Sequence, residues 1–306
     1  MDIPRGLQDS VLKIFGPEGR KWLARLPELL HACREKWKLS RCTLSADLSI
    51  NLVCFAMSPD FGSVVLKVGV LHPEYFTEVR ALQLYGGSHV CRCYDDDADL
   101  GAMLLERVVP GHTLATRTSA SERVAVAADL GAALLRPMEH DGGFPLVSDL
   151  AHRAFRRLRG ENRAGPRMLS LADASEPLFG EVDTLGRGLL HGDLHHHNIL
   201  ESGRDTWKAI DPKGQIGPPA MQVARFMINE LDRTRPSEWG NCLNEMIAVF
   251  GARLGVPEHE IALCAFLDRV LSTSWKYEEH LDSDKADDLD QAEFLMKYWS
   301  ERNPHH

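Results

Sequence analysis

Along the first part of the chain, apolar residues recur first at helical and then at strand-like spacing. Positions 17–37 predict an N-terminal helix, in which Pro27 introduces a kink or starts a second helix. A second helical repeat covers 73–86 and is closed by Gly86. Apolar runs predict strands at 50–57, 63–70, 90–94 and 101–108. With one more strand before the loop 45–51, the pattern predicts a five-stranded antiparallel sheet and one main helix.

The rest of the chain is predicted to be mainly helical. Ser119 and Glu122 form a capping box at the start of a helix over 119–138. Further helical repeats follow, at 219–232, 238–254, 257–276 and 287–301. A short strand–loop–strand segment at 188–211 interrupts this helical region.

This change of pattern divides the chain into two predicted lobes. Residues 1–109 are expected to form a small antiparallel β lobe with its helices, and residues 110–306 a larger, mainly α lobe. The boundary falls where an apolar strand ends in Pro110 and Gly111. Within the small lobe, Asp95–Asp99 is expected to be an acidic turn between two strands. The predicted fold class is α+β.

The segment 191–198 carries the strongest chemical signal. It reads His-Gly-Asp-Leu-His-His-His-Asn, and Asp211 follows at the end of a short apolar run. An H-x-D-x-x-x-x-N pattern followed by a second Asp is the layout of phosphoryl-transfer sites in protein-kinase-like enzymes. Asp193 is placed to orient or deprotonate an acceptor hydroxyl. Asn198 and Asp211 offer the oxygen ligands that Mg²⁺ prefers, with ATP phosphates and water completing its coordination.

The same octapeptide, 191–198, has two less specific interpretations. Its His residues are also compatible with a Zn²⁺ site, although no Cys or Glu lies nearby at ligand spacing. It is also compatible with a solvated loop that matches a short pattern by chance. The order of the other kinase-like features along the chain favours phosphoryl transfer.

A lysine inside a strand-like run provides the first of these features. Lys67 lies in the apolar run 63–70, and a buried lysine needs a partner. Kinases pair such a lysine with a glutamate on the next helix so that it can hold ATP phosphates. Glu78 is the predicted partner, and Glu74, one turn earlier, is the alternative.

The apolar run that ends at Pro110 and Gly111 provides the second feature. It lies between Lys67 and Asp193 in the sequence, where a hinge between two kinase lobes is expected. Backbone groups near Glu106 and Val108 are the predicted partners of the adenine ring. An ordinary strand and turn is the alternative interpretation.

Two segments, 188–200 and 207–217, resemble the aminoglycoside phosphotransferases. The Asp-Pro-Lys-Gly sequence that begins at Asp211 is most similar to the branch of the streptomycin 6-kinases and hydroxyurea kinases. The resemblance extends over about residues 40–230. It implies a protein-kinase-like two-lobe fold and ATP-dependent phosphorylation of a hydroxyl on a small molecule. An aminoglycoside such as streptomycin is the first candidate, which would make the protein an antibiotic-resistance enzyme.

The resemblance also implies roles for single residues. Asp193 would be the catalytic base, Asn198 and Asp211 would bind Mg²⁺, and Lys67 would bind phosphate. The chain departs from the family pattern at three places: the loop 45–51 has no glycine, and Pro218 and Gln222 stand where the branch usually carries acidic residues. Asp-Phe-Gly and Ala-Pro-Glu motifs do not occur, so a kinase that phosphorylates proteins is not expected.

Composition and charge narrow the class of partner. The 306 residues are 44% apolar and 26% charged, which is ordinary for a globular protein. A formal net charge of −9 argues against nucleic-acid binding and suits a cationic small substrate. No signal peptide or membrane-spanning run is found, and the seven scattered Cys residues indicate reduced thiols, so we expect a cytoplasmic protein.

An acidic stretch at 278–293 contains eight Asp or Glu residues and one Lys. Such a run is typical of a solvated helix face. The functional alternative is a surface that attracts cationic amines, with Asp282, Asp284, Asp287 and Asp288 among its members. Four aromatic residues are candidate pocket walls, although at helical spacing such residues are more often part of the core: Trp239, Trp275, Tyr277 and Trp299.

Two rival functions remain open at this point. One is the same chemistry on another acceptor, such as hydroxyurea, a peptide antibiotic, or a choline-, homoserine- or sugar-like metabolite. The other is a non-catalytic pseudokinase that binds nucleotide or a partner. The glycine-free loop 45–51 favours the second, whereas the complete set of Lys67, Asp193, Asn198 and Asp211 argues against it. The sequence also leaves GTP open as a donor and gives no oligomeric state.

Overall fold

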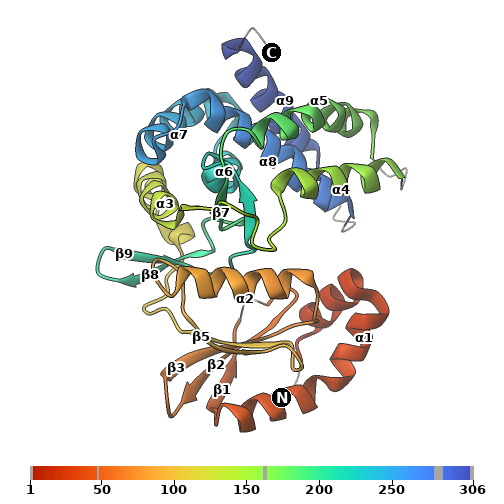
Figure 1. Ribbon diagram of the computed structural model, residues 1–306, viewed down its shortest axis with the longest axis vertical. Helices are drawn as coiled ribbons and strands as arrows, with labels where there is room; N and C mark the ends of the chain where they lie inside the picture. The colour runs from red at the N-terminus through yellow and green to blue at the C-terminus, as the bar shows by residue number, and fades with distance from the viewer. Residues whose placement is uncertain (1–2, 47, 161–163, 279–284, 304–306) are drawn as a thin grey trace. The chain divides into compact units, whose positions relative to one another are not determined.

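The computed structural model describes residues 3–46, 48–160, 164–278 and 285–303 (Figure 1). The chain forms two compact units, Met1–Gly111 and His112–His306. This division lies close to the one predicted after residue 109.

The first unit contains the predicted five-stranded antiparallel sheet. The strands are hydrogen-bonded in the order β1-β2-β3-β5-β4, so β3 lies at the centre. Their bounds are β1 Ser40–Leu44, β2 Leu52–Ser58, β3 Gly62–Val68, β4 Cys93–Asp97 and β5 Ala102–Glu106.

Two helices cover opposite faces of this sheet: α1 (Arg5–Lys36) and α2 (Pro73–Tyr85) (Figure 1). Helix α1 is longer than the predicted 17–37, and its two helical segments meet at Gly16, where the backbone leaves the helical conformation. The backbone stays helical at Pro27, so the second helical segment does not start there as one alternative predicted. Gly16 adopts a φ of 52°, which favours glycine, and Pro17 then begins the second helical segment.

The alternation of side chains along β3 divides its residues between the two faces. Val64, Leu66 and Val68 are buried in the core cluster that includes the apolar face of α1. Lys67 points to the other face, since successive side chains of a strand alternate. Helix α2 covers that face, where Tyr75 donates its hydroxyl proton to the carbonyl of Ala102 at 3.0 Å. The strand therefore presents Lys67 to α2 and Val64, Leu66 and Val68 to α1.

The acidic segment at 95–99 differs from the prediction. Strand β4 extends to Asp97, so Asp95 and the next two residues belong to a strand and not to a turn. This strand forms the edge of the sheet, where charged side chains can reach solvent and neighbouring groups. Asp95 accepts a hydrogen bond from Trp37 at 2.7 Å, and Asp97 pairs with Lys36 at 2.7 Å. The acidic residues thus link the edge strand to the end of α1.

The second unit is mainly helical. Its α-helices are α3 Ala120–Leu134, α4 Val147–Gly160, α5 Pro166–Val182, α6 Met221–Leu231, α7 Trp239–Leu254, α8 Glu258–Glu278 and α9 Lys285–Arg302. Its short strands are β6 Arg136–Pro137, β7 Gly188–Leu190, β8 Ile199–Gly203, β9 Thr206–Ala209 and β10 Gln215–Gly217. Helix α8 is central, since it packs against α4, α5, α6, α7 and α9.

The observed elements confirm the predicted α+β class. Of the capping box predicted at the start of α3, the N-cap contact is present: the Ser119 hydroxyl accepts from the Glu122 backbone N–H at 3.2 Å. Helices α4 and α5 were not among the predicted elements. No helix within the described residues is both long enough and apolar enough to cross a membrane.

Candidate phosphoryl-transfer site

Two hydrogen-bonded strands bring the predicted metal ligands near each other in the second unit. Strands β8 and β9 form a hairpin in which Ile199 pairs with Ala209. The Ile210 N–H extends the hairpin by donating to the Asn198 carbonyl at 2.9 Å. Asp211 follows directly, with a φ of 57° that turns the chain away from the strand. Asn198 and Asp211 therefore lie at the same end of the hairpin, as their spacing predicted.

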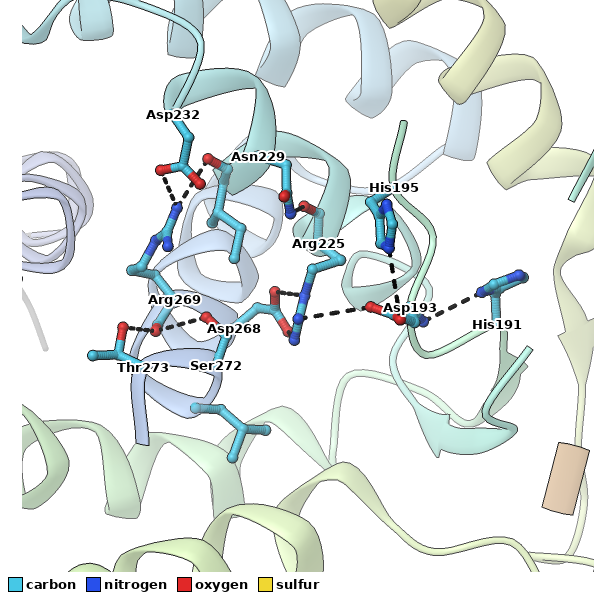
Figure 2. Close-up of polar contacts among 12 residues, drawn as sticks. His191, Asp193, His195, Arg225, Asn229, Asp232, Asp268, Arg269, Ser272 and Thr273 are labelled. Carbon is cyan, nitrogen blue, oxygen red and sulfur yellow. Dashed lines mark hydrogen bonds and ion pairs between the residues drawn. The ribbon is translucent and has the colours of Figure 1, made fainter. Parts of the chain in front are cut away.

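Asp193 lies in the loop between β7 and β8, and both of its carboxylate oxygens face a cationic or basic group (Figure 2). Its Oδ1 is 3.7 Å from Arg225 Nη1, and its Oδ2 is 3.7 Å from His195 Nε2. Its backbone carbonyl accepts a hydrogen bond from Asn198 Nδ2 at 3.0 Å. The loop thus connects the candidate base directly to a candidate metal ligand.

These neighbours keep the Asp193 carboxyl group ionised. Burial alone would raise its pKa, but the charges of Lys213, Arg225 and His195 outweigh burial and lower the pKa below its usual range. An ionised carboxylate only accepts hydrogen bonds, so it can orient the proton of a hydroxyl group. The charge state of Asp193 therefore suits the predicted role.

His191 anchors the start of the loop as a neutral side chain. It is completely buried, and burial lowers its pKa to about 4. Its Nδ1 accepts from the Asp193 N–H at 3.3 Å, so its Nε2 donates to the Ile210 carbonyl at 2.9 Å. A single side chain thus ties the Asp193 loop to the residue before Asp211.

The other two buried or half-buried histidines of the octapeptide have different partners. His196 Nε2 donates to the buried carboxylate of Glu230 at 2.6 Å, and Arg123 binds the same carboxylate. His195 faces Asp193. Because these side chains diverge, they do not form the Zn²⁺ site considered above. Within the described part of the chain, no group of three or more His, Cys, Asp or Glu side chains is arranged to hold a metal ion.

The departure at Gln222 has a structural explanation. Gln222 is only 2% exposed, and its Oε1 accepts a hydrogen bond from the His191 backbone N–H at 2.9 Å. An acidic side chain at this position would supply the same acceptor. The Nε2 of Gln222 is buried and has no hydrogen-bond partner among the described residues. The substitution therefore preserves the anchor of the loop but leaves one buried donor unsatisfied.

The donor chemistry around Asn198 fits a hard divalent cation. The Asn198 amide donates through Nδ2 to Asp193, which leaves its Oδ1 as the acceptor. The Asp211 carboxyl group lies one residue beyond the Asn198–Ile210 hydrogen bond. One amide oxygen and one carboxylate are the protein ligands that Mg²⁺ uses together with phosphates and water.

In the first unit, the structure brings Lys67 and Glu78 together as predicted. Lys67 Nζ lies 2.6 Å from Glu78 Oε1, and the two side chains are 8% and 12% exposed. The alternative partner, Glu74, instead begins α2, where its N–H donates to the His72 side chain at 3.2 Å. A lysine held by a buried carboxylate in this way has an ordered ammonium group.

The two predicted adenine contacts differ in their available backbone groups. The Glu106 N–H donates to the Arg92 carbonyl at 2.8 Å and is therefore occupied. Val108 lies just after β5, and neither its N–H nor its C=O has a hydrogen-bond partner among the described residues. Of the two backbone N–H groups, only that of Val108 remains for a ligand such as adenine.

In the part of the acidic stretch 278–293 that the structure describes, most carboxylates pair with cations of the same unit. Asp282 and Asp284 lie outside the described residues, and Asp287 is exposed. Asp288, in contrast, is buried at 3% exposure and pairs with Arg269 and Lys276 at 2.9 and 2.7 Å. Two further members of the stretch, Asp290 and Glu293, both pair with Arg167. Most of the described carboxylates thus neutralise cations of the same unit.

The aromatic residues considered as pocket walls differ in burial and in their neighbours. Trp239 and Trp299 are 9% and 6% exposed and belong to the helical core. Trp275 is half-buried and lies beside two cations, with Lys213 Nζ 5.4 Å and the Arg225 guanidinium carbon 5.5 Å from its ring centre. Trp275 is thereby linked to the surroundings of Asp193.

Sequence reasoning missed Arg225 as a neighbour of Asp193 and Asp268 as the partner of Arg225. Both are charged residues on largely apolar helices, α6 and α8, and they pair at 2.8 Å. The available signal was that a charge on a buried helix face requires a partner. Spacing gives no partner here, since 43 residues separate the two in sequence.

Comparisons with known proteins show the family of the chain. A family model described as "Aminoglycoside/hydroxyurea antibiotic resistance kinase" matches residues 37–280. Streptomycin 6-kinase of Streptomyces griseus is 31% identical over 229 residues, covering 72% of this chain and 73% of that protein. Hydroxyurea phosphotransferase of Kitasatospora aureofaciens is 28% identical over 299 residues, covering 87% and 86%.

One solved structure shows the fold class. A thermostable mutant of an aminoglycoside phosphotransferase, in a ternary complex with ADP and hygromycin B, matches with a TM-score of 0.61 at 14% identity. The match covers 87% of this chain and 97% of that one. This likeness confirms the predicted protein-kinase-like fold.

Proposed function

Because the chain belongs to the aminoglycoside/hydroxyurea antibiotic resistance kinase family, and is thus a small-molecule phosphotransferase acting on a hydroxyl group, we propose that it phosphorylates an aminoglycoside with ATP as donor. Streptomycin is the first candidate acceptor, because streptomycin 6-kinases are among the relatives that share the family. A role in antibiotic resistance follows from this proposal.

One observation carries the proposal: Asp193 is an ionised carboxylate bonded through its own backbone to Asn198. We assign Asp193 to the acceptor hydroxyl. Its carboxylate would accept the hydroxyl proton and hold the oxygen in line with the γ-phosphate. Transition states of this reaction are largely dissociative, so orientation and charge neutralisation contribute more than strong base catalysis.

The nucleotide is assigned to a separate group of residues. Lys67, ordered by Glu78, would bind ATP phosphates. The Val108 N–H and the Glu106 backbone carbonyl would bind adenine. Asn198 and Asp211 would hold Mg²⁺, which supplies positive charge to the phosphate oxygens.

Hydroxyurea is a second candidate acceptor, and one observation favours it. The side chains of Lys213 and Arg225 place two positive charges near Asp193, and the carboxylates of Asp193 and Asp268 partly offset them. A guanidinium group of streptomycin would be repelled at short range, whereas a small neutral acceptor would not. The hydroxyurea phosphotransferase match also extends over 87% of this chain. If streptomycin is the acceptor, its guanidinium groups must lie away from Asp193 and from the neighbouring cations Lys213 and Arg225.

A panel of acceptors tests the proposal directly. The purified protein would be incubated with ATP, Mg²⁺ and one compound at a time: streptomycin, hygromycin B, hydroxyurea, choline or homoserine. We expect streptomycin to gain the mass of one phosphoryl group, with hydroxyurea as the second expectation. Turnover of choline or homoserine far above both would reject the proposed acceptors and retain only the small-molecule kinase.

A thermal-shift measurement, combined with the turnover assay, distinguishes an active enzyme from a pseudokinase. An enzyme and a pseudokinase can both be stabilised by ATP with Mg²⁺, because any ligand of the folded state stabilises it. Only the enzyme transfers phosphate to an acceptor. Stabilisation by ATP without turnover of any compound in the panel would favour the pseudokinase.

A further inference from the structure

Arg225, on α6, lies at the centre of a chain of charged side chains that begins at Asp193 (Figure 2). Its Nε and Nη2 donate to the two carboxylate oxygens of Asp268, on α8, at 2.8 and 3.1 Å. Its remaining nitrogen, Nη1, is 3.7 Å from Asp193 Oδ1. The planar guanidinium group therefore uses one edge for Asp268 and turns the other toward the candidate base.

The position of this guanidinium group is restricted on several sides. The side chains of Arg225 and Asp268 are 16% and 11% exposed, so neither is free to move into solvent. Trp275 lies 5.5 Å from the guanidinium carbon. The backbone carbonyl of Arg225 accepts a hydrogen bond from Asn229 Nδ2 at 2.7 Å. A bidentate pair between two packed helices is a rigid support for a third group.

The charges in this group are also coupled. Burial alone would lower the pKa of Arg225, but Asp268 and Asp193 outweigh it and raise the pKa. Arg225 in turn is among the charges that lower the pKa of Asp193. Each charge is thus stabilised by the presence of the others, and removal of Arg225 would leave two buried carboxylates that repel each other.

The separation of 3.7 Å between Arg225 Nη1 and Asp193 Oδ1 is that of an ion pair and not of a hydrogen bond. Catalytic contacts are often long in proteins without substrate and shorten in the reacting complex. A purely structural link between α6 and α8 would need only the Asp268 contact. Such a link would not require Nη1 to be oriented toward Asp193, as it is here.

We infer that Arg225, held by Asp268, is a positioning residue that keeps the Asp193 carboxylate in the orientation needed by the acceptor hydroxyl. This inference rests on the proposed role of Asp193. Arg225 faces the proposed base, so its loss should lower kcat, whereas the KM for ATP should stay nearly unchanged. A misplaced catalytic group can reduce the rate by about 10²-fold, and we expect a reduction of this order.

Substitution at Arg225 can be compared with a matched control at Arg269. Arg269 is also a buried arginine, lies on α8 and pairs with Asp288 and Asp232, but has no contact with Asp193. Arg225→Lys keeps the charge but loses the bidentate geometry, and Arg269→Lys makes the same change elsewhere in the unit. With streptomycin and ATP, Arg225→Lys should lower kcat strongly, whereas Arg269→Lys should lower the melting temperature with little change in kcat.

Chemical rescue distinguishes positioning from folding. Arg225→Ala leaves space beside Asp268 for a free guanidinium ion. Added guanidinium chloride at about 50 mM should restore kcat at least about tenfold, since a single oriented group contributes about that much or more. Sodium chloride at the same concentration should not. Failure of rescue, together with near wild-type kcat in Arg225→Lys, would overturn the inference.

A structural measurement decides the inference even if streptomycin is not the acceptor. In a crystal structure of Arg225→Met, we expect the Asp193 carboxylate to leave the position it holds in the wild-type protein or to occupy several rotamers. An unchanged carboxylate in that variant would contradict the inference. Asp193→Ala tests the proposed function separately: if it retains wild-type turnover, the base assignment fails whatever Arg225 does.

Discussion

Asp288 and Arg269 form an ion pair in the helical unit, with Asp288 Oδ1 2.9 Å from Arg269 Nη1. Their side chains are 4% and 2% exposed. Arg269 also binds Asp232 and Gln291, and Lys276 binds the second oxygen of Asp288. Part of an acidic sequence that suggested a substrate-attracting surface therefore connects α8 and α9.

We predict that Asp288→Asn destabilises the protein without changing the KM for streptomycin. Removing one partner of a buried ion pair leaves the other charge uncompensated, which costs about 3–5 kcal/mol. The free energy of unfolding, measured with urea, should fall by that order. Asp287→Asn is the matched control, because its side chain is exposed and such changes stay within about 0.5 kcal/mol. An increase in KM for streptomycin with unchanged stability would restore the surface-recruitment hypothesis for this residue.

The catalytic assignment predicts that Asp193→Ala loses turnover but keeps ATP binding. A general base contributes about 10²–10⁴-fold to the rate. The Asp193 carboxylate faces Arg225 and His195, whereas ATP is assigned to other residues, Lys67 among them. Steady-state kinetics and isothermal titration with ATP would measure the two effects. Asp205→Ala, an exposed change in the β8–β9 hairpin, is the control. More than about a tenth of the wild-type rate in Asp193→Ala would show that the assignment is wrong.

The metal assignment predicts unequal effects at Asn198 and Asp211. Asp211→Asn removes a charged oxygen ligand and should abolish the dependence of ATP affinity on Mg²⁺. Asn198→Ala removes a neutral ligand, together with the hydrogen bond to the Asp193 carbonyl, and should weaken that dependence less. Titration of Mg²⁺ at constant ATP, read by nucleotide binding, gives both values. Small and equal effects would favour a solvated loop in place of a metal site.

The ion pair between Lys67 and Glu78 allows the ATP-binding role to be tested with a conservative substitution. Glu78→Gln keeps the size of the side chain but removes the charge that orders Lys67. The KM for ATP should increase, and Lys67→Met should increase it further, because the ammonium group itself is lost. Glu74→Gln is the control, since Glu74 lies on the same helix and its N–H caps the helix through His72. Equal KM values for ATP in all three variants would contradict the phosphate-binding role.

The sequence predicted the elements that have a strong local signal. Alternating apolar residues predicted the central strands, and the segment 188–211 was predicted as strand, loop and strand. The structure contains that loop, followed by the β8–β9 hairpin. The pairing of Lys67 with Glu78 followed from the rule that a buried charge needs a partner. Each of these inferences concerns residues that are close in sequence or that lie on consecutive elements, as Lys67 on β3 and Glu78 on α2 do.

The features that were missed depend on longer-range packing or weaker patterns. Helix α4 has an amphipathic pattern, but half of its six buried residues are the small Ser148, Ala151 and Ala154, and α5 contains Pro177. The kink at Gly16 depends on a backbone conformation that composition does not reveal. Arg225 and Asp268 meet only because α6 packs on α8. Sequence reasoning without homologues has no means of pairing such distant charges.

The burial of His191 predicts a loss of stability in mild acid. Its folded-state pKa is lowered to about 4 from an ordinary value of 6.5, because burial disfavours the charged form. Between these values the unfolded chain binds a proton that the folded chain does not, so the free energy of unfolding falls as the pH decreases from 6.5 towards 4. The full loss from this group is on the order of 3 kcal/mol, and little more is lost below pH 4, where both states are protonated.

Urea unfolding at several pH values, without Mg²⁺ or nucleotide, would measure this slope in the wild-type protein and in His191→Asn. The variant is expected to be less stable at pH 7, since its side chain cannot span from the Asp193 N–H to the Ile210 carbonyl. Its slope between pH 6.5 and 4 should nevertheless be shallower by up to one proton. His197→Asn, at an exposed position of the same loop, is the matched control. Identical slopes in His191→Asn and the wild-type protein would show that His191 is not the neutral anchor of the Asp193 loop.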